Sequence, residues 1–378
     1  MAGFFRKFTK QLIIGSNLLV SVAMLLLYLL PVADPNRFWF LNLLALAFPL
    51  LVIAQLGFLV FWLFAKRKLV WIPLLSFVLC YPLLRSTIGT TFSSKKETAA
   101  GFTTATWNVH LLDFYEHNGH HSSSMLQSIR DLQADVLAVQ ELVFSLDSNS
   151  EMSLDKLKQK LGYTYAVAGN DRKFGVHTNG GTKNERYFPF CVGIFSKYPI
   201  LQWQKVQTLR EYNHTFIWAD IKVATDTIRF FNIHLQSMHF ARRDYDFIEN
   251  IDNQGMQQVK STGKSIIRKM KQANVLRALQ IKSVEEEIAK SPYPVILCGD
   301  FNDVPNSYAY QTMQSKLNDT HAEKGFGIGR TFLKLSPTLR IDYIFCSKSL
   351  KPLSNTTVSG GESDHKAVKV SFALPVTE

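Results

Sequence analysis

Val295-Ile-Leu-Cys-Gly-Asp-Phe-Asn-Asp303 joins an apolar run directly to polar side chains. The apolar part, from Val295 to Cys298, predicts a short buried strand. Asp300 and Asn302 follow at once, so a carboxylate and a carboxamide converge on one point at the end of that strand. Oxygen donors of this kind suit a hard cation and a phosphate oxygen. Taken alone, the same residues would also form an Asx turn, so the interpretation depends on the rest of the chain.

Polar residues recur at the ends of other apolar runs. Strand ends on one edge of a sheet gather in space even when they lie far apart in the sequence, and side chains held there are positioned rigidly. The polar residues placed in this way are Asn108, Glu141, His234, Asp300, Asn302, Asp342, Asp364 and His365. Singly, most of them also suit a turn, a solvated strand end or a core histidine. Asp342 is the exception, because a carboxylate inside the apolar run from Ile341 to Phe345 needs a partner, and His365 is the natural one.

Seven short motifs follow one another along the chain. They are Thr106-Trp-Asn-Val-His110, Gln140-Glu141, Phe195-Ser-Lys-Tyr-Pro-Ile200, Asn232-Ile-His-Leu235, Gly299-Asp-Phe-Asn-Asp303, Arg340-Ile-Asp-Tyr-Ile-Phe345 and Ser363-Asp-His365. Together they resemble the signature of the endonuclease/exonuclease/phosphatase superfamily, which includes pancreatic-type deoxyribonuclease, abasic-site endonucleases, inositol polyphosphate 5-phosphatases and neutral sphingomyelinases. The resemblance covers residues 102–374 and implies an α/β fold, a four-layer sandwich of two mixed β-sheets flanked by helices. The loose alternation of strand and helix patterns independently favours mixed sheets with helices outside.

The resemblance implies a divalent metal site. Glu141 would bind the metal ion, which is usually Mg²⁺, with Mn²⁺ as the alternative. Asn108 would lie close to the ion, and Asp364 would support the metal side of the site.

The resemblance also implies roles in catalysis. Asp300 and Asn302 would orient the attacking water and hold a phosphate oxygen. His365, aligned by Asp342, would act on the water or on the scissile phosphate, and His234 would stabilise the developing negative charge. Either Asp300 or His365 would serve as the general base, and the sequence does not decide between them.

These assignments fit the hydrolysis of a phosphodiester. The reaction needs an activated water in line with the leaving oxygen, and cations or donors where negative charge accumulates. Two classes of substrate remain open: nucleic acid, and the headgroup of a phospholipid or sphingolipid. A different function also remains open, namely a membrane-anchored binding or scaffold module that kept the fold and lost catalysis. Such a module should lack a metal or dyad residue, whereas all of them are present here.

Three uncharged apolar runs precede the motifs: residues 12–30, 38–64 and 69–84. A membrane span needs about 20 apolar residues, so the first two runs qualify and the third is short. We therefore expect residues 1–85 to form a membrane segment with two to three transmembrane helices. Residues 86–101 are polar and small and predict a linker. Residues 102–378 would form the catalytic domain, which we expect to fold when cut from the spans near Gly101.

Flanking charge predicts the orientation of an integral membrane protein. Basic residues occur at Arg6, Lys7 and Lys10 and in the cluster Lys66-Arg67-Lys68, whereas the loop from Pro31 to Arg37 is nearly neutral. The positive-inside rule places both basic clusters in the cytoplasm. Three spans would put the catalytic domain on the extracytoplasmic side, and the topology inverts if the third run does not cross.

The net charge of +12 is unevenly distributed. Residues 1–90 contain eight of the 42 Lys/Arg residues and one of the 30 Asp/Glu residues, a surplus of +7. Residues 91–378 therefore have a surplus of only +5, which is weak evidence for a polyanionic partner. The four cysteines lie in apolar runs, and their spacing predicts neither a zinc site nor a disulfide framework.

Local signals predict some further elements. A helix should begin after Ser122-Ser-Ser124, and Ser153 to Leu161 should form a capped helix closed by Gly162. Residues 169–189 are Gly-rich, polar and without periodicity, which predicts a surface loop. Residues 240–267 are polar, mixed in charge and poorly periodic. Lys264, Arg268, Lys269 and Lys271 favour a solvated helix face, and contact with a polyanion or a lipid headgroup is the alternative.

Overall fold

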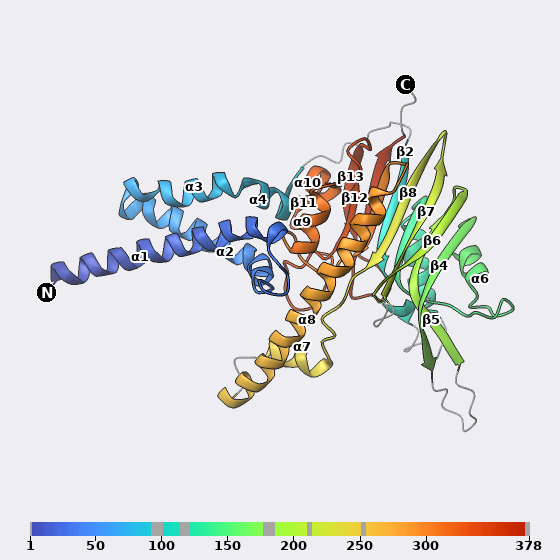
Figure 1. The fold of residues 1–378 in the computed structure, drawn as a ribbon, viewed down its shortest axis with the longest axis horizontal. Coiled ribbons are helices and arrows are strands. Elements are labelled where there is room, and N and C mark those ends of the chain that lie inside the picture. The colour runs from blue at the N-terminus through green and yellow to red at the C-terminus, as the bar shows by residue number, and fades with distance from the viewer. Residues whose placement is uncertain are drawn as a thin grey trace.

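The computed structural model describes residues 2–91, 101–113, 121–176, 186–209, 214–250 and 255–374 of the chain. Two six-stranded mixed sheets lie face to face, and helices cover their outer faces (Figure 1). A bundle of apolar helices extends from one end of this sandwich. The α/β four-layer sandwich predicted from the motifs is therefore confirmed.

The first sheet is antiparallel except for one central parallel pair, β2 and β3. Its strands in spatial order are β13 (Pro352–Val358), β14 (Ala367–Ala373), β2 (Gly101–Asn108), β3 (Val136–Val143), β5 (Arg186–Ser196) and β4 (Tyr165–Val176). In the parallel pair, Asn108 lies opposite Gln140. The last residue of β2 therefore lies beside Glu141 at one edge of the sheet.

The second sheet repeats this arrangement with the parallel pair β8 and β9. Its strands in spatial order are β10 (Asn318–Asp319), β12 (Asp342–Cys346), β9 (Val295–Asp300), β8 (Asp226–His234), β7 (His214–Val223) and β6 (Ile200–Leu209). Asp300 pairs with His234 on one side and with Asp342 on the other. Three polar residues thus end up in one row across the sheet.

Apolar side chains fill the space between the two sheets. Phe102 and Ile194 of the first sheet pack in one buried cluster with Ile217, Phe230 and Ile296 of the second. This burial sets the register, because a slip of one residue would turn each apolar side chain to the opposite face. The strand ends that carry the polar residues are thereby held at fixed positions.

Helices cover the outer faces of the sandwich. They are α5 (Ser123–Asp131) and α6 (Leu154–Leu161) on the first sheet, and α8 (Met256–Ala289) and α9 (Tyr308–Gln314) on the second. The hydroxyls of Ser122 and Ser153 accept hydrogen bonds from Met125 N and Lys156 N, and so cap α5 and α6. Gly162 ends α6 with a φ of +80°, a conformation that favours glycine. The short elements η3 (His110–Asp113), α7 (Arg242–Glu249) and α10 (Thr320–Lys324) lie in the connections.

Two segments differ from the sequence-based expectation. Most of the loop predicted at 169–189 continues β4 to Val176 and begins β5 at Arg186, and residues 177–185 lie outside the described part of the chain. Backbone pairing between β4 and β5 extends both strands, although the sequence there does not alternate between apolar and polar residues. Residues 240–267 contain α7 and the start of α8, a helix whose apolar contacts come from its C-terminal half around Ile281 and Val284.

The bundle contains α1 (Ala2–Leu25), η1 (Leu26–Val32), α2 (Leu41–Ala65), η2 (Arg67–Leu69), α3 (Trp71–Leu79) and α4 (Tyr81–Thr87). Two helices, Phe4–Val32 and Leu41–Ala65, are long and apolar enough to cross a membrane. The third apolar run forms Arg67–Leu79 and Tyr81–Thr87, which are bent by 62° and would make either a broken span or a re-entrant segment. The helices run side by side, α1 toward the sandwich, α2 away from it and α3 back (Figure 1).

Buried polar side chains join the helices of the bundle to one another. Asn17 Nδ2 donates to Gln55 Oε1 at 3.0 Å, and Trp62 Nε1 donates to Asn17 Oδ1 at 3.0 Å. Ser76 Oγ donates to Ser21 Oγ at 2.7 Å. Such bonds between helices satisfy polar groups that an apolar surrounding would leave unpaired.

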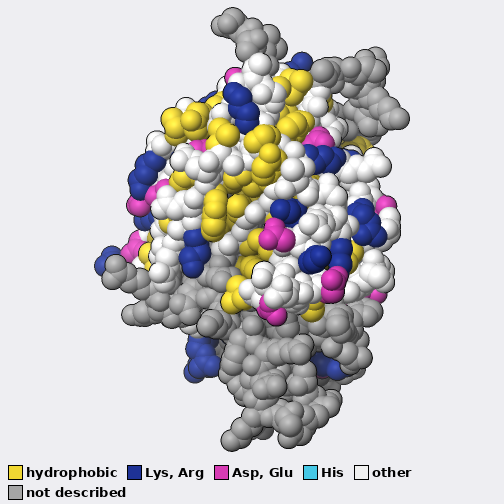
Figure 2. Space-filling view, turned by 90° about the vertical axis from the view of Figure 1, so that its right-hand side faces the viewer, with side chains coloured by type: hydrophobic (Ala, Val, Ile, Leu, Met, Phe, Trp, Pro, Cys, Tyr) yellow, Lys and Arg dark blue, Asp and Glu magenta, His cyan; other side chains and the backbone are white. Residues whose placement is uncertain are grey.

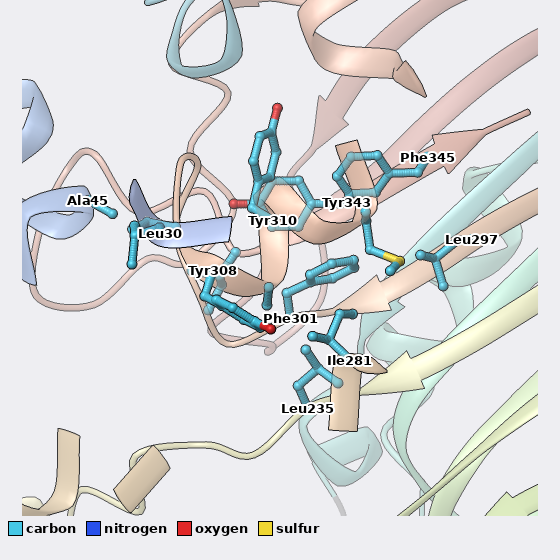
Figure 3. Close-up of a cluster of buried hydrophobic side chains, with 14 of the residues drawn as sticks. Leu30, Ala45, Leu235, Ile281, Leu297, Phe301, Tyr308, Tyr310, Tyr343 and Phe345 are labelled. Atoms are coloured by element: carbon cyan, nitrogen blue, oxygen red, sulfur yellow. The ribbon is translucent and has the colours of Figure 1, made fainter. Parts of the chain in front are cut away.

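The bundle packs tightly on the sandwich. Leu30 and Ala45 of the bundle belong to the same buried cluster as Tyr308 and Phe301, as Figure 3 shows. The strand β1 (Gly89–Thr90) pairs with β11 (Phe326–Gly327). Part of the linker expected at 86–101 is thus packed on the globular domain, and residues 92–100 lie outside the described chain.

Candidate active site

The ends of the central strands surround one cavity of about 390 Å³. Six of the eight residues singled out in the sequence line it: Asn108, Glu141, Asp300, Asn302, Asp364 and His365. The other two lie beside them: His234 next to Glu141 and Asp300, and Asp342 next to His365. The fold therefore brings all eight residues, which lie far apart in the sequence, to one place.

Two carboxylates from different sheets meet at the amide of Asn108. Asn108 Nδ2 donates to Glu141 Oε1 at 3.2 Å and to Asp300 Oδ2 at 3.1 Å. His234 Nε2 lies 3.9 Å from the same Glu141 oxygen and 3.6 Å from the same Asp300 oxygen. The three elements β2, β3 and β9 thus converge on a small acidic centre next to an imidazole.

Asp300 is buried at this centre and fixed by the segment that follows β9. Asn302 N donates to Asp300 Oδ1 at 2.7 Å, and Asn302 Nδ2 donates to Leu235 O at 3.0 Å. Burial, and then the negative charge of Asp342, raise the pKa of Asp300, against the opposing effect of the two nearby histidines and Asn108. A positive charge added nearby would stabilise the ionised form of this carboxylate.

His365 and Asp342 form a buried pair beside the acidic centre. His365 Nδ1 lies 2.9 Å from Asp342 Oδ2, and His365 Nε2 lies 3.9 Å from Asp300 Oδ2. Burial lowers the pKa of His365, but Asp342 and Asp300 outweigh burial and raise that pKa to about 10. Because Nδ1 is occupied by Asp342, the atom that His365 presents to the cavity is Nε2.

Several backbone contacts hold this pair in place. Thr331 Oγ1 accepts hydrogen bonds from the backbone N–H groups of Ile341 and Asp342. Trp107 Nε1 donates to His365 O at 2.9 Å. Ser363 Oγ accepts from His365 N at 3.0 Å and donates to Asn108 O at 2.7 Å, so it connects the pair to the strand that carries Asn108.

Glu141 and Asn302 are among the cavity residues with a strained backbone. Glu141 has a φ of +53° and Asn302 a φ of +51°. Glu141 lies where the register of β3 against β5 shifts, between Val139 and Leu142. A bulge of this kind redirects a side chain at a modest energetic cost, and such strain is concentrated at functional sites. At Glu141 the bulge and the positive φ occur where the carboxylate faces the cavity.

The donor set fits a divalent metal ion. Glu141, Asp300 and Asn108 offer mainly oxygen, as a hard cation requires. In addition, ligand atoms of Asp300, Asp342 and His365 lie within 4.8 Å of one another. Asp342 Oδ1 is buried without a hydrogen-bond partner among the described residues. The carboxylates of Glu141 and Asp300 and the unpartnered oxygen of Asp342 therefore leave negative charge that a bound cation would compensate.

Asp364 occupies a different position from the other acidic residues. It lines the cavity, but its Oδ2 lies 2.7 Å from Lys334 Nζ. Burial raises the pKa of Asp364, but the hydrogen bond from Lys334 and the positive charges of His365, His110 and Lys334 together outweigh burial and lower that pKa. The carboxylate that the motif resemblance placed on the metal side is therefore already paired with a lysine.

Further cavity residues carried no signal in the sequence. Lys334 and Tyr245 come from segments between the motifs. Arg277, in the polar helix α8, has its Nε 3.4 Å from Asp303 Oδ2 and also donates to Asn302 O. Asn42, Leu43 and Leu46 of α2 also line the cavity. Nothing in their local sequence marks them as neighbours of a catalytic centre.

Comparison with known proteins places this geometry in a family. The sequence matches the Endonuclease/Exonuclease/phosphatase family over residues 105–365. Residues 10–87, which form most of the bundle, match a domain of unknown function. No curated protein matches the sequence closely enough to count as a relative.

Solved structures of the same kind share the fold at low sequence identity. An endonuclease/exonuclease/phosphatase from Beutenbergia cavernae DSM 12333 has a TM-score of 0.52 and 18% identity, over 72% of this chain and 72% of that chain. A family protein from Leptotrichia buccalis C-1013-b has a TM-score of 0.49 and 17% identity, over 72% and 99%. A mannosyl-6-phosphatase of Bacteroides thetaiotaomicron VPI-5482 has a TM-score of 0.47 and 16% identity, also over 72% and 99%.

The family match extends over more than half of the chain and includes all eight polar residues singled out in the sequence. The fold agrees with that of the Beutenbergia protein. The chain therefore belongs to the endonuclease/exonuclease/phosphatase family, whose members are metal-dependent phosphoric ester hydrolases, and it is an enzyme of that class.

Proposed function

We propose that this enzyme hydrolyses phosphodiester bonds by attack of water, with a divalent metal ion bound at Glu141. Asn108 lies beside that carboxylate, and Asp364 supports the same side of the site. Mg²⁺ is the ion expected, with Mn²⁺ as its alternative. A bound ion would supply positive charge to a phosphate oxygen and promote ionisation of water. The observation that carries the proposal is the meeting of the Glu141 and Asp300 carboxylates with the Asp342–His365 pair around one cavity.

The other residues of the site have roles in orienting the water and in stabilising the phosphate. Asp300 and Asn302 orient the water and hold a phosphate oxygen, since both face the cavity and fix each other. His365 presents Nε2 to the reacting groups because Asp342 holds Nδ1. His234 lies close enough to Asp300 to donate to a phosphate oxygen at the same centre. Donors placed where negative charge develops are the main source of rate enhancement in such a reaction.

The proposal includes a membrane anchor and an orientation. Lys66-Arg67-Lys68 follow the end of α2 that lies away from the sandwich, and α1 begins at the same end (Figure 1). Both basic clusters of the sequence therefore lie at the far end of the bundle. The positive-inside rule puts that end in the cytoplasm, and the catalytic domain would then lie on the extracytoplasmic side.

Turnover of a generic substrate tests the proposal. The full-length protein in detergent should hydrolyse bis-p-nitrophenyl phosphate when Mg²⁺ or Mn²⁺ is added, and Glu141→Ala and His365→Ala should each abolish this activity. Glu151→Ala is the matched control, because Glu151 is an exposed residue outside the cavity. Absence of metal-dependent turnover on any phosphodiester or phosphomonoester would contradict the proposal.

A further inference from the structure

One wall of the catalytic cavity belongs to a candidate membrane span. Asn42, Leu43 and Leu46 of α2 line the cavity together with Asp300 and His365. The start of α2 is fixed there, because Asn42 Nδ2 donates to Asp303 Oδ2 at 3.0 Å and Asn42 Oδ1 accepts from Tyr308 N at 2.9 Å. The cavity therefore opens where the bundle meets the catalytic domain.

Aromatic residues mark this level as a membrane boundary. Phe38, Trp39 and Phe40 directly precede α2, and Phe38 and Phe40 are 45% and 47% exposed. Aromatic side chains are typical of the interface between lipid and water, where an apolar ring meets the headgroups. The cavity residues Leu43 and Leu46 follow within the next turns of the same helix. Headgroups of the nearer leaflet would thus lie at the height of the catalytic site.

The cavity-lining face of α2 continues outside the cavity as an apolar stripe. Leu46, Leu50 and Ile53 follow Leu43 at spacings that keep them on one side of a helix, and they are 36%, 67% and 63% exposed. This stripe leads from the catalytic cavity into the part of the helix that would lie in the bilayer. A cavity of about 390 Å³ holds a polar headgroup, while the stripe offers a path for an acyl chain.

The cavity lining outside α2 includes apolar side chains, and basic side chains lie farther along α8. Met238, Phe240 and Met270 line the cavity from the segment after β8 and from α8. Farther along, the N-terminal half of α8 exposes Lys260, Lys264, Arg268 and Lys271, and residues 256–271 contain no Asp or Glu. This half of the helix projects toward the side on which the bundle lies (Figure 1), and Lys271 Nζ lies 5.9 Å from the Trp39 ring.

Charge on the face of the molecule turned away from the bundle does not suggest a nucleic acid. Among the described residues on the face turned away from the bundle, Lys/Arg and Asp/Glu side chains are interspersed and form no continuous basic stripe (Figure 2). A duplex or single strand needs such a stripe along its phosphates. The basic residues of α8 instead gather beside the bundle, where anionic lipid headgroups would lie.

From these observations, which rest on the proposed function of the cavity, we propose that the substrate is a phosphate ester of a membrane lipid in the leaflet next to the catalytic domain. Its headgroup would enter between the start of α2 and α8, and an acyl chain would stay on the stripe of Leu46, Leu50 and Ile53. The water oxygen forms a new bond to phosphorus, and the bond from phosphorus to one ester oxygen breaks. That oxygen takes up the proton that the water loses.

The test uses the full-length protein in vesicles of phosphatidylcholine and phosphatidylglycerol, with release of the water-soluble product followed by mass spectrometry. Bis-p-nitrophenyl phosphate is assayed in the same vesicles. The double variant Leu50→Gln, Ile53→Gln, at two stripe residues outside the cavity, should lower kcat/KM on the lipid by about tenfold, because apolar contact with the chain is lost. Turnover of the soluble ester should stay within about twofold of the wild type, since its binding does not use the stripe. Leu63→Gln, on another face of α2, is the matched control and should change neither rate.

A second variant tests the basic half of α8. Lys264→Glu should lower lipid hydrolysis about fivefold on vesicles that contain phosphatidylglycerol and leave it unchanged on pure phosphatidylcholine. Lys282→Glu, exposed farther along the same helix, is the control and should have no effect on either vesicle.

The outcomes separate this inference from the proposed function. Turnover of the soluble ester without lipid hydrolysis, or equal lipid rates in the stripe variant and the wild type, would overturn the inference and leave the phosphodiesterase activity intact. A higher kcat/KM on an oligonucleotide than on the lipid would also overturn it. Loss of all turnover would refute the proposed function itself.

Discussion

Nδ1 of His365 lies 2.9 Å from Oδ2 of Asp342 in the interior of the domain. The backbone of His365 forms an isolated bridge with Phe332, and Thr331 next to it binds the backbone of Asp342. The carboxylate therefore holds the imidazole from a fixed position, and Nε2 is left to face the acidic centre.

Asp342→Asn should lower kcat about 10–100-fold, because the amide replaces an acceptor that orients the imidazole. KM should change little and the domain should stay folded, since the side chain keeps its size and its buried position. The thermal unfolding midpoint should fall, because the buried imidazole of His365 loses its charged partner. Steady-state kinetics on bis-p-nitrophenyl phosphate and a thermal melt of the same preparation provide the measurement. Asp131→Asn, at an exposed helix end, is the control. An unchanged kcat would show that the pair does not contribute to turnover.

Removal of divalent metal should abolish activity. The wild type treated with EDTA should lose turnover and regain it when Mg²⁺ or Mn²⁺ is restored. Glu141→Gln should require about 10–100-fold more metal for half-maximal activity, the range that loss of a metal-site contact typically costs. Isothermal titration of the metal gives the same comparison without relying on turnover, and Glu151→Gln serves as control. Equal metal affinity in wild type and Glu141→Gln would remove Glu141 from the site.

Gly299→Ala should destabilise the domain strongly. Gly299 has a φ of +147°, and a Cβ there would lie 2.0 Å from Ile233 O, in the neighbouring strand β8. Both the backbone conformation and the clash oppose the substitution, so we expect a loss of about 4 kcal/mol or more in the free energy of unfolding.

Gly263→Ala is the matched control for this substitution. Gly263 lies in α8, and a methyl group added there would have nothing within 4 Å, so alanine should stabilise the helix by about 1 kcal/mol. Chemical denaturation of both variants measures the two effects. A Gly299→Ala protein as stable as the wild type would mean that β8 and β9 are not in the register described here.

Stability should fall as the pH drops from about 6.5 to about 4, because of His321. Its Nε2 lies 3.0 Å from Gly327 O, and burial, followed by the positive charge of Arg340, lowers the pKa of His321 to about 4. The unfolded chain binds a proton near pH 6.5, where the folded chain does not. The contribution of His321 to the free energy of unfolding is therefore complete above about pH 6.5. Below that pH it decreases by at most about 1.4 kcal/mol per pH unit.

Thermal melts of the wild type and His321→Gln across this pH range test the effect of His321. The variant should show a flatter dependence on pH, whereas His110→Gln, an exposed histidine, should follow the wild type. Parallel curves for wild type and His321→Gln would assign the acid sensitivity to other groups.

Cutting the chain near Gly101 should destabilise the catalytic domain. The sequence alone favours a domain that folds without the spans, but Phe48 and Ala45 pack in one buried cluster with Tyr308, and Asn42 hydrogen-bonds the buried carboxylate of Asp303. The fragment should aggregate or melt at a lower temperature than the full chain in detergent, because it exposes apolar surface and the carboxylate of Asp303 loses one hydrogen-bond donor. Size-exclusion chromatography and melts compare the two. A monomeric fragment with full turnover would show that the catalytic domain folds without the membrane segment.

The sequence by itself determined the local features of this protein. Serine caps and a left-handed glycine set the limits of α5 and α6, and the apolar runs set the positions of the central strands. Polar residues directly after those runs, such as Asn108, Glu141 and Asp300, were identifiable because a strand end positions a side chain without reference to the rest of the fold. The apolar runs at the N-terminus predicted the helices of the bundle for the same reason.

Only the tertiary structure decided which of these surfaces meet. Leu43 and Leu46 of α2 lie on a catalytic cavity formed by residues more than 60 positions away, and Lys334 forms an ion pair with Asp364. Neither relationship has a signature in spacing or composition. Both depend on the packing of separate elements, whose free energy comes from surfaces buried together and not from the preferences of either segment.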